Sequence, residues 1–151
     1  PYEEAGYWRD VGTIPAYWHA HMDLLGPEPR LDLDNDRWPI LTAPFRGPST
    51  RIILGDVSDS ILGEGALVDG ATIRRSIIGR GVRVGRGASV EDSIIMERTT
   101  IATGAHVRRA VIDRYNAIPE GERIGEDGEI DRRRFHVDPS GLVVVPRGQT
   151  R

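Results

Sequence analysis

The 151-residue sequence contains 28% charged and 38% hydrophobic residues and has a formal net charge of −3; this is the composition of a soluble globular protein, without the basic surplus that nucleic-acid binding requires. No apolar run approaches the roughly 18 residues of a membrane span, so we expect no membrane partner. Cysteine is absent, which excludes disulfides and thiolate zinc sites and fits a cytoplasmic location, and lysine is absent too, so any anion site has to use arginine or backbone amides.

The first predicted element is an amphipathic helix near the amino terminus. Its apolar residues recur at helical spacing: Ile14, Trp18, Met22 and Leu25. Thr13 is suited to cap the helix before Pro15 in the first turn, and Gly26 is suited to end it. The chain starts at Pro1 without a methionine, and we expect a fragment or a processed product.

Residues 27–50 follow with five prolines and little hydrophobic periodicity. Because proline and glycine interrupt regular structure, this composition predicts an extended linker that lies on a surface. Four apolar side chains are suited to hold it there: Trp38, Ile40, Leu41 and Phe45.

A repeat of 16 or 17 residues then dominates the chain up to Ile124. One aliphatic column is Leu62, Ile78, Ile95 and Ile112. A second is Val68, Val84, Ile101 and Ile118. A third is Val57, Ile73, Val90, Val107 and Ile124. A fixed period with three columns predicts a solenoid with three flat sides, each side contributing one inward aliphatic residue per coil. The β-branched columns favour short strands, and the glycines between them favour bends.

The tail pattern predicts a hairpin. Residues 135–137 and 142–145 are apolar segments on either side of the turn sequence 138–141. Such a hairpin is able to cover one end of the solenoid.

Two segments contain acidic residues that we consider as metal ligands. Asp10, in the motif 7–13, is either an acid favoured by the dipole of the following helix or a magnesium ligand, and a magnesium site would need a second carboxylate and a phosphate. Residues 32–36 resemble the start of a calcium loop, but Ala43 occupies the position of the required glutamate, so we expect no calcium there.

The histidines suggest no metal centre. His19 and His21 are two residues apart on the predicted helix and therefore point to different faces. His106 aligns with Ser89 and Thr72 of earlier repeats, and we interpret it as a surface residue at a bend. A general base would also need a cleft and an orienting partner.

The arginines allow two interpretations that spacing does not separate. They cluster as Arg74-Arg75, Arg108-Arg109 and Arg132-Arg133-Arg134, with Arg83, Arg86 and Arg114 between. One interpretation is a solvated face paired with Glu64, Glu91 and Glu97. The other is a patch whose guanidinium groups hold phosphate oxygens. No glycine-rich phosphate loop precedes a helix.

Several motifs together resemble bacterial ADP-glucose pyrophosphorylase (glucose-1-phosphate adenylyltransferase). The segments 7–18 and 21–24 resemble the end of that family's catalytic domain, and 37–40 resembles its linker. The last coils and the tail are similar as well, at 111–114, 118–121, 124–125, 133–135 and 141–145. The resemblance therefore covers nearly the whole chain.

The resemblance implies the C-terminal part of that enzyme. Residues 1–26 would end the nucleotidyltransferase domain, 27–50 would be the linker, and 51–151 would form a left-handed parallel β-helix of hexapeptide repeats with a C-terminal hairpin. The expected fold is thus mainly β, preceded by one helix and an extended linker. The helix would pack on an N-terminal catalytic domain outside this chain, which would leave its tryptophan-rich face partly exposed and favour self-association.

The family makes ADP-glucose and pyrophosphate from ATP and glucose 1-phosphate, with magnesium, for glycogen synthesis. By resemblance, Asp10 matches a magnesium ligand, and Trp8 matches an aromatic residue that lines the sugar pocket. Arg114 and Arg147 match arginines that bind a phosphorylated allosteric effector, and β-helices join subunits into a homotetramer. The nucleotide loop belongs to the N-terminal domain, so we expect the isolated chain to be inactive.

Three other functions are alternatives to this one, and the coil region fits the second of them poorly. A stand-alone hexapeptide-repeat acyltransferase would use coenzyme A between coils and a catalytic histidine, for which the coils offer only His106. A γ-type carbonic anhydrase would need three histidines at a subunit interface, but the coil region contains only one. A purely structural assembly domain would bind no effector.

Overall fold

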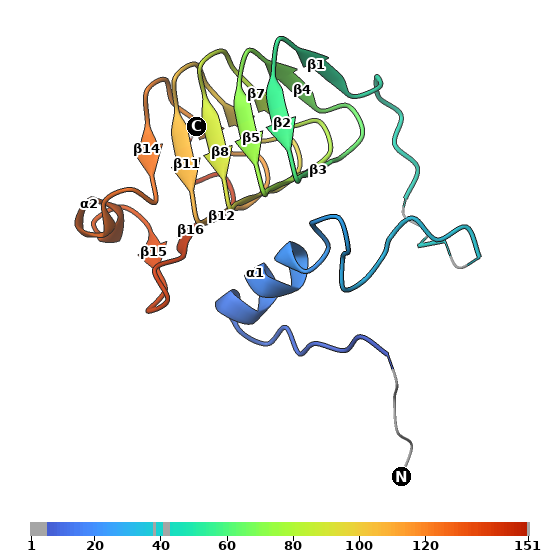
Figure 1. Ribbon diagram of the computed structural model, residues 1–151. Coiled ribbons are helices and arrows are strands. Elements are labelled where there is room, and N and C mark those ends of the chain that lie inside the picture. The colour runs from blue at the N-terminus through green and yellow to red at the C-terminus, as the bar shows by residue number, and fades with distance from the viewer. Residues whose placement is uncertain (1–5, 38, 41–42, 151) are drawn as a thin grey trace.

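The computed structural model describes residues 6–37, 39–40 and 43–150, which form a helix followed by a stack of short strands (Figure 1). The helices are α1 (Ile14–Met22) and α2 (Gly128–Arg132). The strands are β1 (Arg51–Ile53), β2 (Asp56–Ser58), β3 (Ile61–Leu62), β4 (Leu67–Asp69), β5 (Thr72–Arg74), β6 (Ile77–Ile78), β7 (Arg83–Val84), β8 (Ser89–Glu91), β9 (Ile94–Ile95), β10 (Thr100–Ile101), β11 (His106–Arg108), β12 (Ala110–Ile112), β13 (Ala117–Ile118), β14 (Arg123–Ile124), β15 (His136–Val137) and β16 (Val143–Val145).

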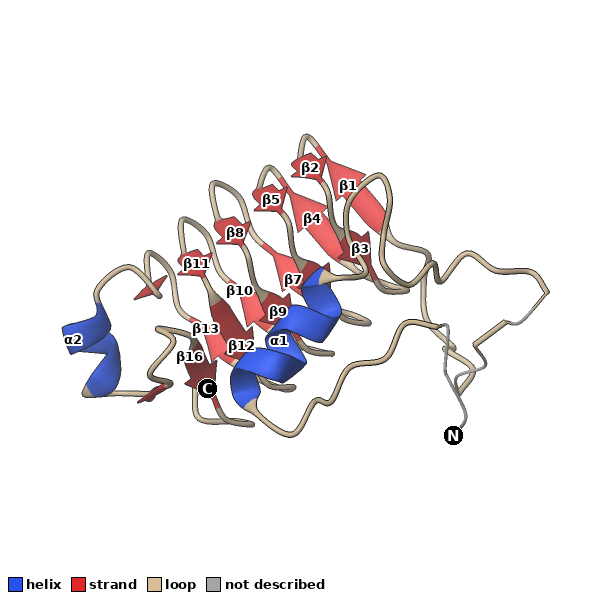
Figure 2. Ribbon diagram, turned by 60° about the horizontal axis from the view of Figure 1, so that its bottom comes forward, coloured by secondary structure: helices blue, strands red, loops and turns tan. Residues whose placement is uncertain are grey.

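The strands form three sheets, one on each side of a parallel β-helix (Figure 2). Sheet A has the order β1-β4-β7-β10-β13, sheet B the order β14-β11-β8-β5-β2, and sheet C the order β15-β16-β12-β9-β6-β3. Every strand of a coil pairs in parallel with the equivalent strand of the next coil, and the antiparallel pair β15–β16 belongs to the tail.

The register confirms the three predicted columns. In sheet C, Ile95 pairs with Ile78 on one side and with Ile112 on the other. In sheet A, Val84 pairs with Val68 and with Ile101. The largest buried side chains come from these columns: Ile73, Ile78, Ile95, Ile101, Ile112, Ile118 and Ile124. Each coil therefore buries its inner face only against its neighbours, as a solenoid requires.

A ladder of hydroxyl groups supports one corner of the β-helix. The Ser76 hydroxyl donates to the carbonyl of Arg74 in its own coil and accepts the Ser93 amide of the next coil at 3.2 Å. The Ser93 hydroxyl repeats this arrangement, accepting the amide of Ala110 at 3.1 Å. Both serines are fully buried, so the ladder satisfies polar groups that would otherwise destabilise the core.

The predicted glycine bends serve two purposes. Gly81 has a φ of +64°, a backbone conformation that favours glycine. Gly79 lies against the next coil, where a Cβ atom would lie 2.7 Å from the backbone nitrogen of Glu97. Both conditions let neighbouring coils approach closely at the corners.

The tail closes the carboxyl end of the β-helix, as predicted. Strands β15 and β16 form the hairpin, and β16 also pairs in parallel with β12 to extend sheet C. Phe135, Val143 and Val145 join the main core. Helix α2 was not predicted; Asp127 caps it, and the buried carboxylate of Asp131 accepts the amide of Gly125 at 2.9 Å.

Helix α1 begins after the predicted cap but ends earlier than predicted. The Thr13 side chain accepts the Ala16 amide at 3.3 Å. The helix ends at Met22, and two single turns continue the chain to Leu25 before Gly26 takes a φ of +95°. The linker 27–50 contains no helix or strand in its described residues, as predicted.

Helix α1 packs on the outer face of sheet C. Trp18 and Met22 are buried against Ile94, Val111 and Leu142. Ile94 and Val111 precede the inward column residues of β9 and β12, and successive side chains of a strand point to opposite faces. The helix thus covers a second apolar face that lies outside the core.

Polar contacts fix the orientation of Trp18 in this interface. Its indole Nε1 donates to the carbonyl of Asp92 at 2.8 Å, and the guanidinium carbon of Arg109 lies 5.5 Å from the ring centroid. The expectation that the tryptophan-rich face is left exposed was therefore wrong for Trp18, which is 5% exposed, because sheet C provides the partner surface. Trp8 is 74% exposed.

The columns predict a large cost for truncating an inward residue. Ile95→Ala should lower the free energy of unfolding by roughly 2–5 kcal/mol, because it leaves a cavity between coils. Urea unfolding measures this loss. Thr103→Ala, at an exposed bend, should change stability by no more than about 0.5 kcal/mol; equal losses in the two variants would contradict the packing described.

The two tryptophans provide a matched test of the helix interface. Trp18→Ala should destabilise the chain by roughly 3–5 kcal/mol, because it removes a buried ring. Trp18→Phe should cost less, because it keeps most of the apolar contact and loses the indole hydrogen bond. Trp8→Ala should leave the urea transition unchanged; a Trp18→Ala variant as stable as Trp8→Ala would show that α1 does not dock on sheet C.

Candidate functional site

The segment that leads into α1 is held to the end of that helix. Asp23 receives a hydrogen bond from the Tyr7 hydroxyl at 2.9 Å and an ion pair from Arg9 at 2.7 Å. Trp8 lies between Tyr7 and Arg9 in the chain and Asp10 follows Arg9; the side chains of Trp8 and Asp10 are both exposed to solvent. The sequence predicted these two site residues, and the structure places them together on one exposed segment.

Asp10 is an accessible carboxylate. Its Oδ1 accepts the Gly12 amide at 3.0 Å, which fixes the side chain beside the start of α1. In the part of the chain that the structure describes, no three His, Cys, Asp or Glu residues gather as metal ligands. Asp10 therefore fits a hard cation such as magnesium only as one ligand among others that come from outside these residues.

Arg114 precedes Tyr115 in the chain, and Arg147 contacts the ring of Tyr115. The Arg114 guanidinium pairs with Glu97 at 3.1 Å and with Asp113 at 3.6 Å. The guanidinium carbon of Arg147 lies 4.7 Å from the centroid of the Tyr115 ring. Although 32 positions separate them in sequence, the tail returns to this bend and brings the two predicted residues into one neighbourhood.

The same bend lies close to α1. Burial raises the pKa of Tyr17, the negative charge of Asp113 raises it further, and the positive charge of Arg114 lowers it. An open cavity of about 300 Å³ lies beside the contact between the start of α1 and sheet C, and is lined by Val11, Gly12, Thr13, Ile14, Tyr17, Val111 and Val144. The opening segment and the Arg114 bend therefore lie on the same side of the β-helix.

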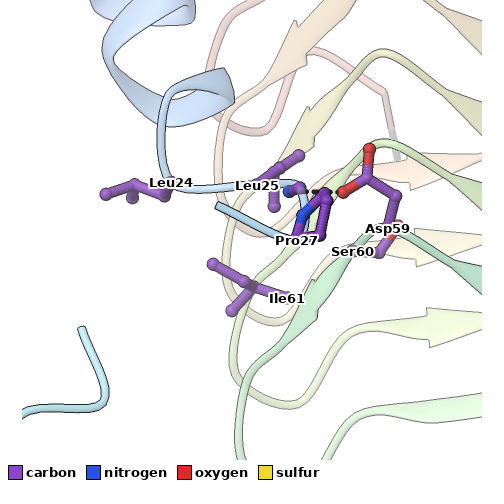
Figure 3. A pocket seen from close by; sticks show the side chains of 7 residues that line it. Leu24, Leu25, Pro27, Asp59, Ser60 and Ile61 are labelled. Carbon is purple, nitrogen blue, oxygen red and sulfur yellow. Dashed lines mark hydrogen bonds between the residues drawn. The ribbon is translucent and has the colours of Figure 1, made fainter. Parts of the chain in front are cut away.

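A larger cavity of about 650 Å³ lies where the chain leaves α1 (Figure 3). Leu24, Leu25, Pro27 and Ile61 make it largely apolar, and Asp59 accepts the Gly26 amide at 2.6 Å across it. This hydrogen bond ties the end of the helical segment to the first coil. The cavity brings no general base or nucleophilic pair together.

The remaining candidates have structural roles. Asp32 accepts the Asp34 amide at 2.9 Å in a local turn. We expected His106 at a bend, and this prediction was wrong: His106 is the first residue of β11. Its Nδ1 lies 2.8 Å from the Ser89 hydroxyl. The alignment of His106 with Ser89 and of Ser89 with Thr72 is confirmed by the register. Among the predicted linker anchors, Phe45 is half-buried and Ile40 is exposed, whereas Trp38 and Leu41 lie outside the described residues.

Most of the arginines on the coils are paired with acids one coil away. These pairs are Arg74–Asp56, Arg75–Asp92, Arg80–Glu64, Arg86–Asp69, Arg108–Glu91 and Arg114–Glu97. For these residues, the structure supports the solvated, paired face that the sequence left open. The repeat period already aligns Glu64, Arg80, Glu97 and Arg114, so the alternating charges were readable in the sequence.

Within the described residues, neither helix has the length and apolar character needed to cross a bilayer.

Comparisons with known proteins agree with the coil pattern and with the opening motif. The sequence profile of the GlmU-like, C-terminal hexapeptide family matches residues 48–145. Over 97% of its length the chain is 43% identical to a glucose-1-phosphate adenylyltransferase of Thermodesulfovibrio yellowstonii, covering 36% of that protein. It is 40% identical to enzymes of the same name from Anaeromyxobacter and Cutibacterium acnes, over 96% and 98% of this chain and 37% of each relative.

The chain thus spans about a third of the length of these curated relatives and matches their C-terminal part. Profile, coils and register agree on a left-handed β-helix of hexapeptide repeats. The chain belongs to the GlmU-like, C-terminal hexapeptide family.

Proposed function

We propose that this chain is the C-terminal part of a glucose-1-phosphate adenylyltransferase that makes ADP-glucose for glycogen synthesis. The observation that carries the proposal is the match over 97% of the chain, which includes the segment before the coils. A hexapeptide solenoid of another function would share the coils alone. The exposed Trp8 and Asp10, which lie on the segment that leads into α1, are consistent with an attachment to further enzyme.

In this proposal residues 1–26 complete a catalytic domain, and residues 51–151 form its regulatory and assembly domain. The phosphate of glucose 1-phosphate attacks the α-phosphorus of ATP, and pyrophosphate leaves. Magnesium, when bound, would offset the negative charge that develops on the phosphates. Asp10 would hold it together with a carboxylate from the remainder of the enzyme, and Trp8 would line the sugar site.

The proposed effector site is the bend that carries Arg114 and Arg147. A phosphorylated effector suits two guanidinium groups in one neighbourhood, because each is able to donate paired hydrogen bonds to phosphate oxygens. The proximity of Tyr17 to this bend would connect the effector to α1 and so to the segment that carries Asp10. The β-helix would also join subunits into a homotetramer.

Activity should require both parts of the enzyme. The isolated chain should release no pyrophosphate from ATP and glucose 1-phosphate, whereas the whole protein that contains it should do so with magnesium. In the whole protein, Asp10→Asn should lower the rate by about tenfold or more, because a neutral amide holds magnesium less well. A coupled pyrophosphate assay measures both.

Asp32→Asn is the matched control, since Asp32 is another exposed acid in a local turn. It should retain the parent rate. The assignment fails if the isolated chain turns over above background, or if Asp10→Asn and Asp32→Asn are indistinguishable.

The effector site predicts a second effect in the whole protein. Arg114→Gln and Arg147→Gln should each raise the concentration of phosphorylated effector needed for half-maximal response by about tenfold, because a charge-assisted hydrogen bond to phosphate is lost. Arg133→Gln removes the same charge from an exposed position at the end of α2 and should leave the response unaltered. A normal response in both the Arg114 and Arg147 variants would exclude this bend as the effector site.

A further inference from the structure

A hollow lined by three arginines lies at the corner of the coils beside sheet A. It has a volume of about 380 Å³ and lies where the linker crosses the coils beside sheet A. Its lining residues are Phe45, Arg46, Gly47, Pro48, Gly65, Gly81, Arg83, Arg98 and Thr100. The volume suits a small molecule, and no acid is among the lining residues.

The shape of the hollow follows from one column of bend positions. The equivalent positions in successive coils are Gly65, Gly81, Arg98 and Tyr115. The backbone amide of each of the last three donates a hydrogen bond to a carbonyl of the preceding coil. All four residues have a φ between 56° and 72°. The ring of Phe45 covers Gly65, where a Cβ atom would lie 2.6 Å from its Cζ. At Gly81 the nearest neighbour of such an atom is Arg98 Cγ, at 3.8 Å, so this bend is left open.

Arg98 occupies a backbone conformation that is unfavourable for a side-chain-bearing residue. Its φ is +56°, at a position where the two preceding coils use glycine. A positive φ costs a non-glycine residue free energy, and the coils accept this cost at several corners, including Arg75, Asp92 and Arg109. At this bend the arginine side chain starts beside the space that Gly81 leaves open and lines the hollow.

The arginines of the hollow differ from those on the rest of the coils in lacking partners. Within the described ranges, the side chains of Arg46, Arg83 and Arg98 take part in none of the ion pairs or hydrogen bonds. Arg83 pairs in register with Leu67 and Thr100, so neither neighbouring coil offers it an acid. Glu64, which precedes Gly65, already pairs with Arg80 at 3.2 Å.

We infer that this hollow binds the phosphate group of a small molecule, either inorganic phosphate or a phosphate monoester. Arg46, Arg83 and Arg98 all line this one hollow, so their positive charges favour an anion there, and guanidinium matches phosphate geometry through paired donors. The Thr100 hydroxyl adds a neutral donor. The site uses arginines other than Arg114 and Arg147 and does not depend on the proposed catalytic function.

Binding to the chain itself tests the inference. Inorganic phosphate and methyl phosphate are titrated into the chain at constant ionic strength in chloride, and binding is followed by calorimetry and by backbone amide shifts. At least one of the two should saturate, with shifts at Gly81 and Thr100. Arg83→Gln and Arg98→Gln should each weaken binding by about tenfold or more. The tighter of the two ligands identifies whether the free or the esterified group is recognised.

Two further variants separate the hollow from charge in general. Arg133→Gln removes one exposed positive charge elsewhere and should bind as the parent chain does. Gly81→Asn keeps the charge and fills the open bend with a residue that tolerates positive φ, so it should weaken binding while the urea transition is retained. The inference is overturned if neither ligand saturates, if Arg133→Gln weakens binding as much as Arg83→Gln, or if Arg114→Gln abolishes binding that Arg83→Gln and Arg98→Gln retain.

Discussion

The stacking of aliphatic side chains between successive coils is the interaction on which the rest of this structure depends. Each coil contributes one inward aliphatic residue to each column, and these residues are buried against their equivalents in the neighbouring coils. Because the columns have to stay aligned, successive coils contain a nearly constant number of residues. Because the inner positions are committed to packing, variation in chemistry is confined to the outer positions and the corners. The proposed effector site and the arginine-lined hollow both lie there.

The three sides use their outer positions differently. Sheet C carries apolar residues at Ile94 and Val111 and is covered by α1. Sheet B carries charges that pair across coils, such as Arg108 with Glu91 and Arg74 with Asp56. Exposed pairs of this kind contribute little to stability, so they mainly neutralise the arginines. At the corner beside sheet A, Glu64 and Glu97 are already paired with Arg80 and Arg114, whereas Arg83 and Arg98 form no ion pair within the described ranges.

The repeat period made the fold readable from the sequence, because every inward residue recurs at the same spacing. The Thr13 cap and the tail hairpin were also predictable, since both depend on local residue types. The docking of α1 was missed, although the doublets Ile77-Ile78, Ile94-Ile95 and Val111-Ile112 indicate a sheet that is apolar on both faces. Helix α2 has five residues, too few for a periodic signal.

The sites were predictable only in part, for physical reasons. The opening motif identified Asp10 and Trp8, but one carboxylate does not define a metal site. The neighbourhood of Arg114 and Arg147 depends on the return of the tail to the coil surface, which no local pattern encodes. The positive φ of Arg98 became visible only when the coils were aligned in space.

Native-state hydrogen exchange of the backbone amides tests the central claim of cooperative stacking most directly. The account predicts the slowest exchange in the middle coils, at strands such as β8 and β9, with protection decreasing toward β1, and protection of α1 amides against sheet C. Fast exchange throughout the coils, or equal protection of the coils and the linker, would contradict it.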